Sequence, residues 1–412
     1  MVSQLWEQGA ASAPINRAEL DEALRPFGQS VMLPRAAYVD PAVFAWEQRN
    51  FFDRGWVCVG RSEQLPSPGD QRAEAVGEGG VLLVRGEDGT LRAFANTCRH
   101  RGHELLPCGA GNKHKMIICP YHAWTYTLSG ELYAAAGFRN QQDLDFGQWG
   151  LTALPVAEWH GLIFVDGSGG AVPPLSQALA KLEPIVAPYE AERLVTAASH
   201  GYDAAANWKI VTENYHECYH CPSIHPELCR VTPPRSGENY ATDGPWVGGT
   251  MMLREGMDTM SLDGVSHGVP LRGLDERGLR TVVYVNIFPN ILLSLHPDYV
   301  MTHRMIPVAA DRTRIECTWA FAPEAVSRPD FDPGYAVEFW DITNRQDWAA
   351  CESVQRGLTS PHSRPGPLNP TEDAVYYFVT TLARGYLGQS PWVPSATPFR
   401  AAVWPAEMRA AR

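Results

Sequence analysis

Short stretches of alternating apolar and polar residues dominate the chain between residues 50 and 166 and predict β-strands. The clearest stretches are residues 81–85, 91–95, 124–127, 132–135 and 159–165. The first two flank Gly86-Glu-Asp-Gly89, and the next two flank Leu128-Ser-Gly-Glu131. Both connectors contain the glycine and polar residues that are typical of hairpin turns. This part of the chain is therefore predicted to be a small all-β domain.

Longer elements of both kinds follow in the second half of the chain. A helical pattern precedes several strand patterns, at residues 208–219 and then 281–287, 290–295, 299–307 and 312–321. Asp332-Pro333 resembles an N-cap with proline at the first helical position, and predicts a helix to about residue 358. Asn369-Pro370 repeats this signature before residues 371–386. We expect one antiparallel sheet with helices grouped late in the chain, which makes the fold class α+β.

Changes in composition suggest where the domains begin and end. Residues 1–40 form a polar lead-in with one short helix near residues 17–25. The all-β domain is expected over residues 41–166, and a Gly-, Ser- and Pro-rich stretch follows it. The larger domain is expected over residues 175–412.

The charge of the chain limits its partners. It has 34 Lys and Arg against 46 Asp and Glu in 412 residues, a formal net charge of −12. Such a protein lacks the positive field that attracts nucleic acid or an anionic membrane, but it is compatible with a cationic substrate. No apolar run approaches the roughly 20 residues of a membrane span, and no signal peptide is evident. We therefore expect a cytoplasmic protein without a nucleic-acid or membrane partner.

Nine cysteines are present, and this odd number argues against a secreted disulfide framework. In the cytoplasm we expect surface cysteines to stay reduced and clustered ones to bind metal. Cys108 lies off any metal motif, so we expect it to be a small core residue.

Two Cys–His pairs form the first candidate metal site. Cys98-Arg-His100 is followed by Cys119-Pro-Tyr-His122, so each pair places one thiolate and one imidazole on a short loop. Two Cys and two His suit either a structural zinc ion or a [2Fe–2S] cluster with Cys₂ on one iron and His₂ on the other. The mixed pairs favour the cluster, because each loop can then give one ligand to each iron.

A second motif lies at residues 213–225. Glu217 and His220 are three residues apart, which would place them on one face of a helix, and Pro222 would end or kink that helix so that His225 converges. Two imidazoles are the usual start of a 2-His-1-carboxylate iron site. The carboxylate must come from elsewhere, and our best candidate is Asp347 in an apolar helix. The rival candidates are Glu352 and Asp341.

Both motifs resemble those of the Rieske non-haem iron oxygenases, in their large (alpha) subunit. The resemblance implies a [2Fe–2S] cluster on Cys98, His100, Cys119 and His122, and a mononuclear iron on His220, His225 and Asp347. Glu217 matches the acid that bridges the two metal centres in this family, and Asn214 matches a frequent Asn beside it. With glutamate at this position, the chain resembles the group of these enzymes that acts on quaternary ammonium compounds. That group includes choline monooxygenase, glycine betaine and stachydrine demethylases and carnitine oxygenase.

The resemblance implies the terminal oxygenase component of a monooxygenase. We expect O₂-dependent hydroxylation and N-demethylation of a quaternary ammonium compound such as glycine betaine, at Fe(II). The alternatives are an aromatic ring-hydroxylating or O-demethylating Rieske oxygenase, and a non-enzymatic electron carrier or zinc-binding protein. The family also implies a head-to-tail homotrimer in which His122 of one subunit meets Glu217 of the next.

The electrons must come from another protein. The chain has neither a G-x-G-x-x-G motif nor a plant-type Cys-x₄-Cys-x₂-Cys motif. We therefore expect NAD(P)H electrons to arrive through a separate flavin and iron–sulfur reductase or a ferredoxin.

Overall fold

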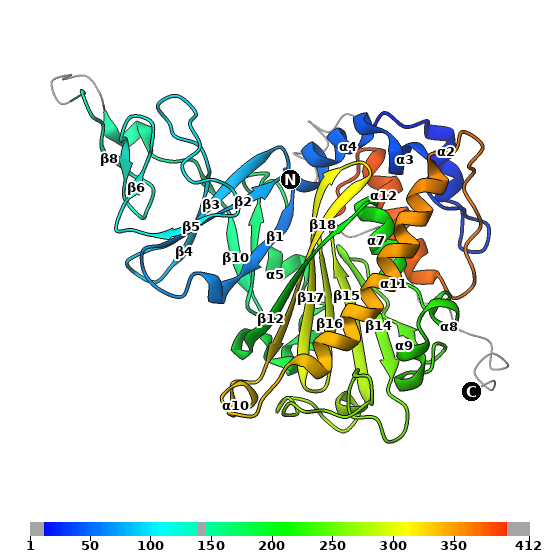
Figure 1. Cartoon of the computed structure of the whole chain (residues 1–412). Helices are drawn as coiled ribbons and strands as arrows, with labels where there is room; N and C mark the ends of the chain where they lie inside the picture. Colours follow the sequence, from blue (N-terminus) through cyan, green and yellow to red (C-terminus); the bar gives the residue numbers. More distant parts are fainter. Residues whose placement is uncertain (1–11, 139–144, 394–412) are drawn as a thin grey trace. The chain divides into compact units, whose positions relative to one another are not determined.

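A computed structural model of the chain describes residues 12–138 and 145–393 (Figure 1). The chain divides into two compact units, Gln48–Leu175 and Met1–Glu47 with Ser176–Arg412. No helix in the described residues is both long and apolar enough to cross a membrane. The fold is α+β, with antiparallel sheets in both units.

The smaller unit is built from three antiparallel sheets. The five-stranded sheet has the order β5 (Gly111–Lys113), β2 (Asp70–Val76), β3 (Gly79–Arg85), β4 (Leu91–Ala95), β9 (Ala153–Leu154). The two three-stranded sheets are β1 (Trp56–Arg61), β11 (Leu162–Asp166), β10 (Val156–Trp159) and β6 (Ile117–Ile118), β7 (Thr125–Tyr126), β8 (Leu132–Ala134). The core between β2, β3, β4 and the β6–β8 sheet includes both cysteines of the first motif.

One predicted strand is wrong. Residues 159–165 are not a single strand, because β10 ends at Trp159 and β11 begins at Leu162, and these two residues pair with each other. The turn between them is His160-Gly161, and both residues have positive φ, 46° and 78°. A two-residue hairpin turn of this kind favours Gly, which tolerates positive φ without strain.

The larger unit is organised around a seven-stranded antiparallel sheet. Its order is β12 (Val195–Ala204), β18 (Arg312–Phe321), β17 (Tyr299–Ala309), β16 (Ile291–Leu295), β15 (Thr281–Ile287), β14 (Trp246–Met252), β13 (Glu238–Asn239). The four predicted strands are β15 to β18. Every residue of β16 is buried, so this central strand is covered on both faces.

Helices α7 (Trp208–Tyr215) and α11 (Gly334–Leu358) pack against each other, α7 also against β17 and α11 against β12 (Figure 1). α11 begins one residue later than predicted, although the Asp332 carboxylate still accepts a hydrogen bond from the Gly334 N–H at 2.8 Å. α7 ends at Tyr215, four residues earlier than predicted. The other α-helices in the described part of this unit are α2 (Arg17–Ala23), α3 (Ala36–Val39), α4 (Pro41–Glu47), α6 (Glu183–Val186), α8 (Cys221–Ile224), α9 (Pro226–Val231), α10 (Pro323–Val326) and α12 (Asp373–Tyr386). Along the chain, α5 (Leu175–Ala178) begins at the last residue of the smaller unit.

Buried charges join the N-terminal helices to α7. The Lys209 ammonium donates to the Glu47 carboxylate at 2.7 Å, and neither side chain is exposed. The Tyr38 hydroxyl donates to a carboxyl oxygen of Glu213, also at 2.7 Å. Such pairs require the partner to be present, because a buried charge without one is costly. Residues 38–47 and α7 therefore depend on each other.

Two candidate metal centres

The two Cys–His loops have the same backbone conformation despite their different spacing. The N–H of each cysteine donates to the carbonyl five residues later, from Cys98 to His103 and from Cys119 to Trp124, at 2.8 Å in both loops. The residues at the fourth position after each cysteine, Gly102 and Ala123, both have positive φ, 71° and 56°. These loops therefore hold their cysteines in equivalent backbone positions.

The four candidate ligands of these loops point to a group larger than one ion. Both cysteines are buried, and the rings of His100 and His122 lie 4.7 Å apart between centroids. His122 Nδ1 is buried and has no hydrogen-bond partner in the described residues, as a nitrogen that faces an absent ligand would be. Ligands around a single zinc would lie roughly 3–4 Å apart. The candidate ligand atoms of these four residues do not all lie within 4.8 Å of one another. In the described part of the chain, a different group of potential ligands does.

Tyr126 adds a contact that sequence analysis did not assign. Its hydroxyl is buried, lies 3.2 Å from Cys98 Sγ and accepts a hydrogen bond from the Arg99 N–H at 3.1 Å. Burial raises the pKa of Tyr126, and the neighbouring Cys98 raises it further. A donor to a cluster thiolate raises the reduction potential of the cluster. No motif marks Tyr126, because the role depends on how β7 packs.

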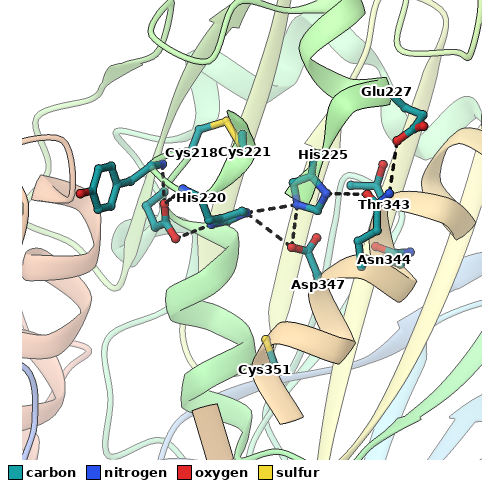
Figure 2. A network of polar contacts seen from close by, with 12 residues as sticks. Cys218, His220, Cys221, His225, Glu227, Thr343, Asn344, Asp347 and Cys351 are labelled. Atoms are coloured by element: carbon teal, nitrogen blue, oxygen red, sulfur yellow. Dashed lines mark hydrogen bonds and ion pairs between the residues drawn. A yellow bond between two sulfur atoms is a disulfide. The ribbon is translucent and has the colours of Figure 1, made fainter. Parts of the chain in front are cut away.

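His220, His225 and Asp347 meet at one point, although Asp347 is more than 120 residues away in the sequence (Figure 2). The two Nε2 atoms lie 3.2 Å apart, and Asp347 Oδ1 lies 2.9 Å from His225 Nε2 and 3.5 Å from His220 Nε2. Ligands at right angles around a metal with bonds of about 2.1 Å lie about 3 Å apart. We call these three residues the triad. Its geometry fits one metal ion, with the ligands on one face.

Outer hydrogen bonds hold both imidazoles of the triad. Glu217 Oε1 accepts from His220 Nδ1, and Gln346 Oε1 accepts from His225 Nδ1 at 2.7 Å. Gln346 in turn donates to Glu227 at 3.2 Å. With Nδ1 of each ring engaged, Nε2 is the nitrogen left for a metal, as in many histidine metal sites. Gln346 was missed by sequence analysis, although it is adjacent to Asp347.

Mutual charge interactions also stabilise the triad. Burial lowers the pKa of His220, but hydrogen bonds to Asp347 and Glu217 outweigh burial and raise it to about 9. Burial raises the pKa of Asp347, and hydrogen bonds to both histidines outweigh this and lower it. The Asp347 carboxylate therefore remains ionised, which is the form that binds a metal.

The expectation that Glu217 and His220 share a helical face is wrong. Residues 216–220 form a turn after α7, and His225 lies between the short helices α8 and α9. Glu217 Oε2 accepts hydrogen bonds from the N–H groups of Tyr219 and His220, at 2.5 and 3.1 Å. These N–H groups thus bond to a side chain rather than to the carbonyls of a continuing helix.

The expectation that clustered cysteines bind metal rather than form bridges is wrong at this turn. Cys218 and Cys221 form a disulfide, with Cα atoms 4.8 Å apart (Figure 2). The turn brings them within the usual range for a bridge. The disulfide closes the four-residue loop that contains His220. Cys108 is also unlike the prediction, because its side chain is exposed.

The rival carboxylates have other partners. Glu352 accepts a hydrogen bond from the Ala205 N–H at 3.1 Å. Asp341 accepts from Tyr202 and Arg345, both at 2.7 Å. Only Asp347 of the three reaches the two histidines.

A cavity of about 480 Å³ opens beside the triad. Its wall includes all three triad residues, Glu217, and Asn214, whose side chain makes no hydrogen bond with the described residues. Four tyrosine and tryptophan residues line the cavity as well. Tyr219 is exposed, and we call the other three, Tyr215, Tyr284 and Trp340, the aromatic wall. A substrate in this cavity would lie next to the metal.

Comparison with known proteins defines the family. Residues 55–144 match the Rieske [2Fe–2S] domain, and residues 191–388 match the catalytic domain of the ring-hydroxylating alpha subunit. The chain is 33% identical to the glycine betaine monooxygenase oxygenase subunit of Chromohalobacter salexigens, over 84% of each chain. The chain belongs to the Rieske oxygenases. A second such subunit, from Pseudomonas aeruginosa, is 31% identical over 90% of this chain and 92% of its own length.

Solved structures of Rieske oxygenases share the fold. A quaternary ammonium Rieske monooxygenase superposes with a TM-score of 0.75 at 24% identity, covering 91% of this chain and all of the other. Naphthalene 1,2-dioxygenase from Rhodococcus superposes with a TM-score of 0.73 at 20% identity. The match covers 91% of this chain and 99% of the dioxygenase chain. This Rieske oxygenase is thus an oxidoreductase that uses a [2Fe–2S] cluster, mononuclear iron and O₂. The zinc-protein and electron-carrier alternatives are therefore wrong.

Proposed function

We propose that this chain is the terminal oxygenase component of a monooxygenase that hydroxylates an N-methyl group of a quaternary ammonium compound such as glycine betaine. The observation that carries the proposal is the aromatic wall beside the triad. Relatives at 31–33% identity are named glycine betaine monooxygenase oxygenase subunits, which supports the same substrate class.

The aromatic wall suits a permanent cation. The Tyr215 hydroxyl donates to the Leu293 carbonyl at 2.7 Å, and the Tyr284 hydroxyl donates to Asn239 at 2.8 Å. Trp340 Nε1 donates to a tyrosine hydroxyl at 2.8 Å. Their polar atoms are thus engaged with the protein, and the rings remain for the ligand. A quaternary ammonium has no N–H to donate, so it is recognised through cation–π contacts with such rings.

Each metal centre has a proposed set of ligands. Cys98, His100, Cys119 and His122 would hold the cluster, and His220, His225 and Asp347 would hold iron. When bound, the iron supplies a position for O₂ activation with electrons passed on by the cluster. We assign the cluster domain to residues 41–166, the catalytic domain to 175–412 and a lead-in to 1–40. In the described part of the lead-in, Tyr38 contacts the catalytic domain.

Glu217 and Asn214 are proposed to act between subunits. In a head-to-tail homotrimer, His122 of one subunit would bond to Glu217 of the next, and Glu217 already bonds to His220 within its own chain. The carboxylate would then join the two centres through two imidazoles and fix their tautomers. Asn214, beside it in the cavity wall, would help to position the incoming subunit or the substrate.

The reaction would be a monooxygenation followed by demethylation. One N–CH₃ group, O₂, two electrons and two protons give N–CH₂OH and water. The N–CH₂OH product then loses formaldehyde and a proton, which leaves the tertiary amine. The electrons would come from NAD(P)H through a separate reductase, and we propose that the enzyme acts in the cytoplasm.

A substrate screen with a surrogate reductase tests the proposal. The purified, iron-loaded enzyme is given betaines, choline and aromatic compounds, and formaldehyde and hydroxylated aromatics are measured. We expect NADH-dependent formaldehyde from quaternary amines, and none without the reductase. Hydroxylated aromatics with no formaldehyde from any amine would overturn the proposal in favour of an aromatic oxygenase.

A further inference from the structure

Among the described residues that line the cavity beside the triad, Arg235 is the only lysine or arginine. Its side chain makes no hydrogen bond or ion pair with any described residue, and it is exposed. Most exposed arginines need no special explanation. Three further observations distinguish this one.

The loop that holds Arg235 is fixed to the sheet on both sides. The Thr232 hydroxyl donates to the Met252 carbonyl at 2.7 Å, and the Met252 N–H donates to the Ser236 hydroxyl at 3.1 Å. Ser236 also bonds back to the Pro233 carbonyl, through its N–H at 3.0 Å. Arg235 therefore extends from an ordered platform on β14, so little backbone freedom is lost when it binds a ligand.

Two other polar side chains of the cavity wall, Asn239 and Ser294, are already engaged. Asn239 accepts from Tyr284 and donates to the Asp373 carboxylate, at 2.8 and 2.6 Å. Asp373 lies behind the wall and does not line the cavity. Ser294 bonds to the Tyr215 hydroxyl at 2.9 Å. The Arg235 guanidinium is thus a set of donors still available to an anionic group.

The formal charges in the cavity wall also make this arginine informative. The acidic residues there are Glu217 and Asp347, whose two negative charges offset the two positive charges of ferrous iron. The charge of Arg235 is then uncompensated in the wall. A ligand with only a positive charge would be repelled by this net positive site. A zwitterion also carries a carboxylate, which can pair with the arginine.

We propose that Arg235 is a specificity-determining residue that binds the carboxylate of a betaine, while the aromatic wall holds its quaternary ammonium group. This inference rests on the proposed function and narrows it from quaternary amines in general to carboxylated ones. A guanidinium matches a carboxylate with two parallel hydrogen bonds, which a lysine ammonium cannot form in the same way.

Two matched pairs of ligands test the inference. Glycine betaine is compared with choline, and a trimethylammonium four-carbon acid with its alcohol, so that each pair differs only in the carboxylate. Binding to the iron-loaded enzyme is measured by calorimetry, and kcat/KM by formaldehyde release. The wild type should bind at least one acid more tightly than its alcohol.

The variants are Arg235→Gln, Arg235→Lys and Arg235→Glu, with Arg272→Gln as the control. Arg272 is an exposed arginine of the same unit that pairs with Glu324 outside the cavity. Arg235→Gln should weaken binding of the acid about tenfold or more and change binding of the alcohol less than about twofold. The affinity of Arg235→Lys for the acid should lie between those of the wild type and Arg235→Gln. Arg235→Glu should bind the alcohol more tightly than the acid. The control should leave both affinities unchanged.

Other outcomes overturn the inference in distinguishable ways. If Arg235→Gln loses affinity equally for the acid and the alcohol, or for neither, Arg235 does not bind the carboxylate. Equal wild-type affinity for acid and alcohol overturns the inference but leaves the quaternary-amine proposal standing. Failure of the wild type to bind any of the four ligands overturns both.

Discussion

The imidazoles of the triad are oriented by side chains on the side away from the metal position. Glu217 bonds to Nδ1 of His220, and Gln346 bonds to Nδ1 of His225. The spacing of residues along the chain was enough to propose both histidines, and an apolar helix around Asp347 was enough to propose the carboxylate. Gln346 could not be proposed from the sequence. Its contact with His225 depends on which turn of α11 packs against that histidine, and no motif indicates this.

Gln346→Met should weaken iron binding by roughly 10- to 100-fold, because it removes the hydrogen bond that orients His225. The measurement is iron retention during titration with a chelator, with the visible spectrum showing that the cluster is intact. Glu352→Gln is the control, on the same helix but bonded to Ala205 instead. Equal iron loss in the two variants would show that α11 has been disturbed in general.

Glu217→Gln should retain both metal centres and slow turnover by at least about tenfold, because the amide cannot accept hydrogen bonds from two imidazoles as a carboxylate does. Single-turnover oxidation of a prereduced cluster measures the affected step directly. Near-normal rates with full metal content would refute the proposed bridging role.

At the scale of elements, apolar patterning identified the strands β15 to β18 and missed β12 and β14 of the same sheet. β15 to β18 follow the predicted ranges closely, since their residues are largely buried. β12 is mostly half-exposed and β14 contains two adjacent glycines, so neither gives a clear apolar pattern. The early end of α7 had no sequence signal either, because it depends on the Glu217 side chain.

The buried face of α7 should make stability depend on pH through Glu213. Burial raises the pKa of Glu213 to about 8, while Tyr38 and Lys209 partly oppose this. Between the ordinary glutamate pKa of about 4.3 and pH 8, the folded state holds the proton that the unfolded state has lost. The free energy of unfolding should therefore fall as pH rises through this window.

Glu213→Gln should remove that dependence and keep an acceptor for Tyr38. The variant should be more stable than the wild type at pH 8, by on the order of 5 kcal/mol, and the difference should shrink towards pH 5. Melting temperatures across this range measure it, with the exposed Glu276→Gln as the control. A difference that does not change with pH would contradict the assignment.

At the scale of the whole molecule, the two candidate metal centres belong to different compact units. Two independent motifs in one chain were enough to predict two metal-binding domains. The assembly could be expected only from the resemblance, because a head-to-tail interface joins two different surfaces and leaves no repeated pattern in the sequence.

Mixed oligomers should show whether electrons cross between subunits. Cys98→Ser should inactivate the cluster and Asp347→Ala the iron site, so each variant alone should be inactive. Random co-assembly would place an intact cluster beside an intact iron in about a quarter of the interfaces, and should restore activity in that proportion. Mixed oligomers verified by two affinity tags but still inactive would place electron transfer within one subunit.

The disulfide between Cys218 and Cys221 has a practical consequence for handling this protein. Thiol reductants are added to many iron–sulfur proteins to prevent oxidative damage. Here the same reagents would act on a covalent loop around His220, beside the proposed iron ligands (Figure 2). During purification the cluster would thus benefit from a thiol reductant, whereas the iron site would benefit from its absence. The iron content of each preparation would then depend on how much thiol reductant it had met.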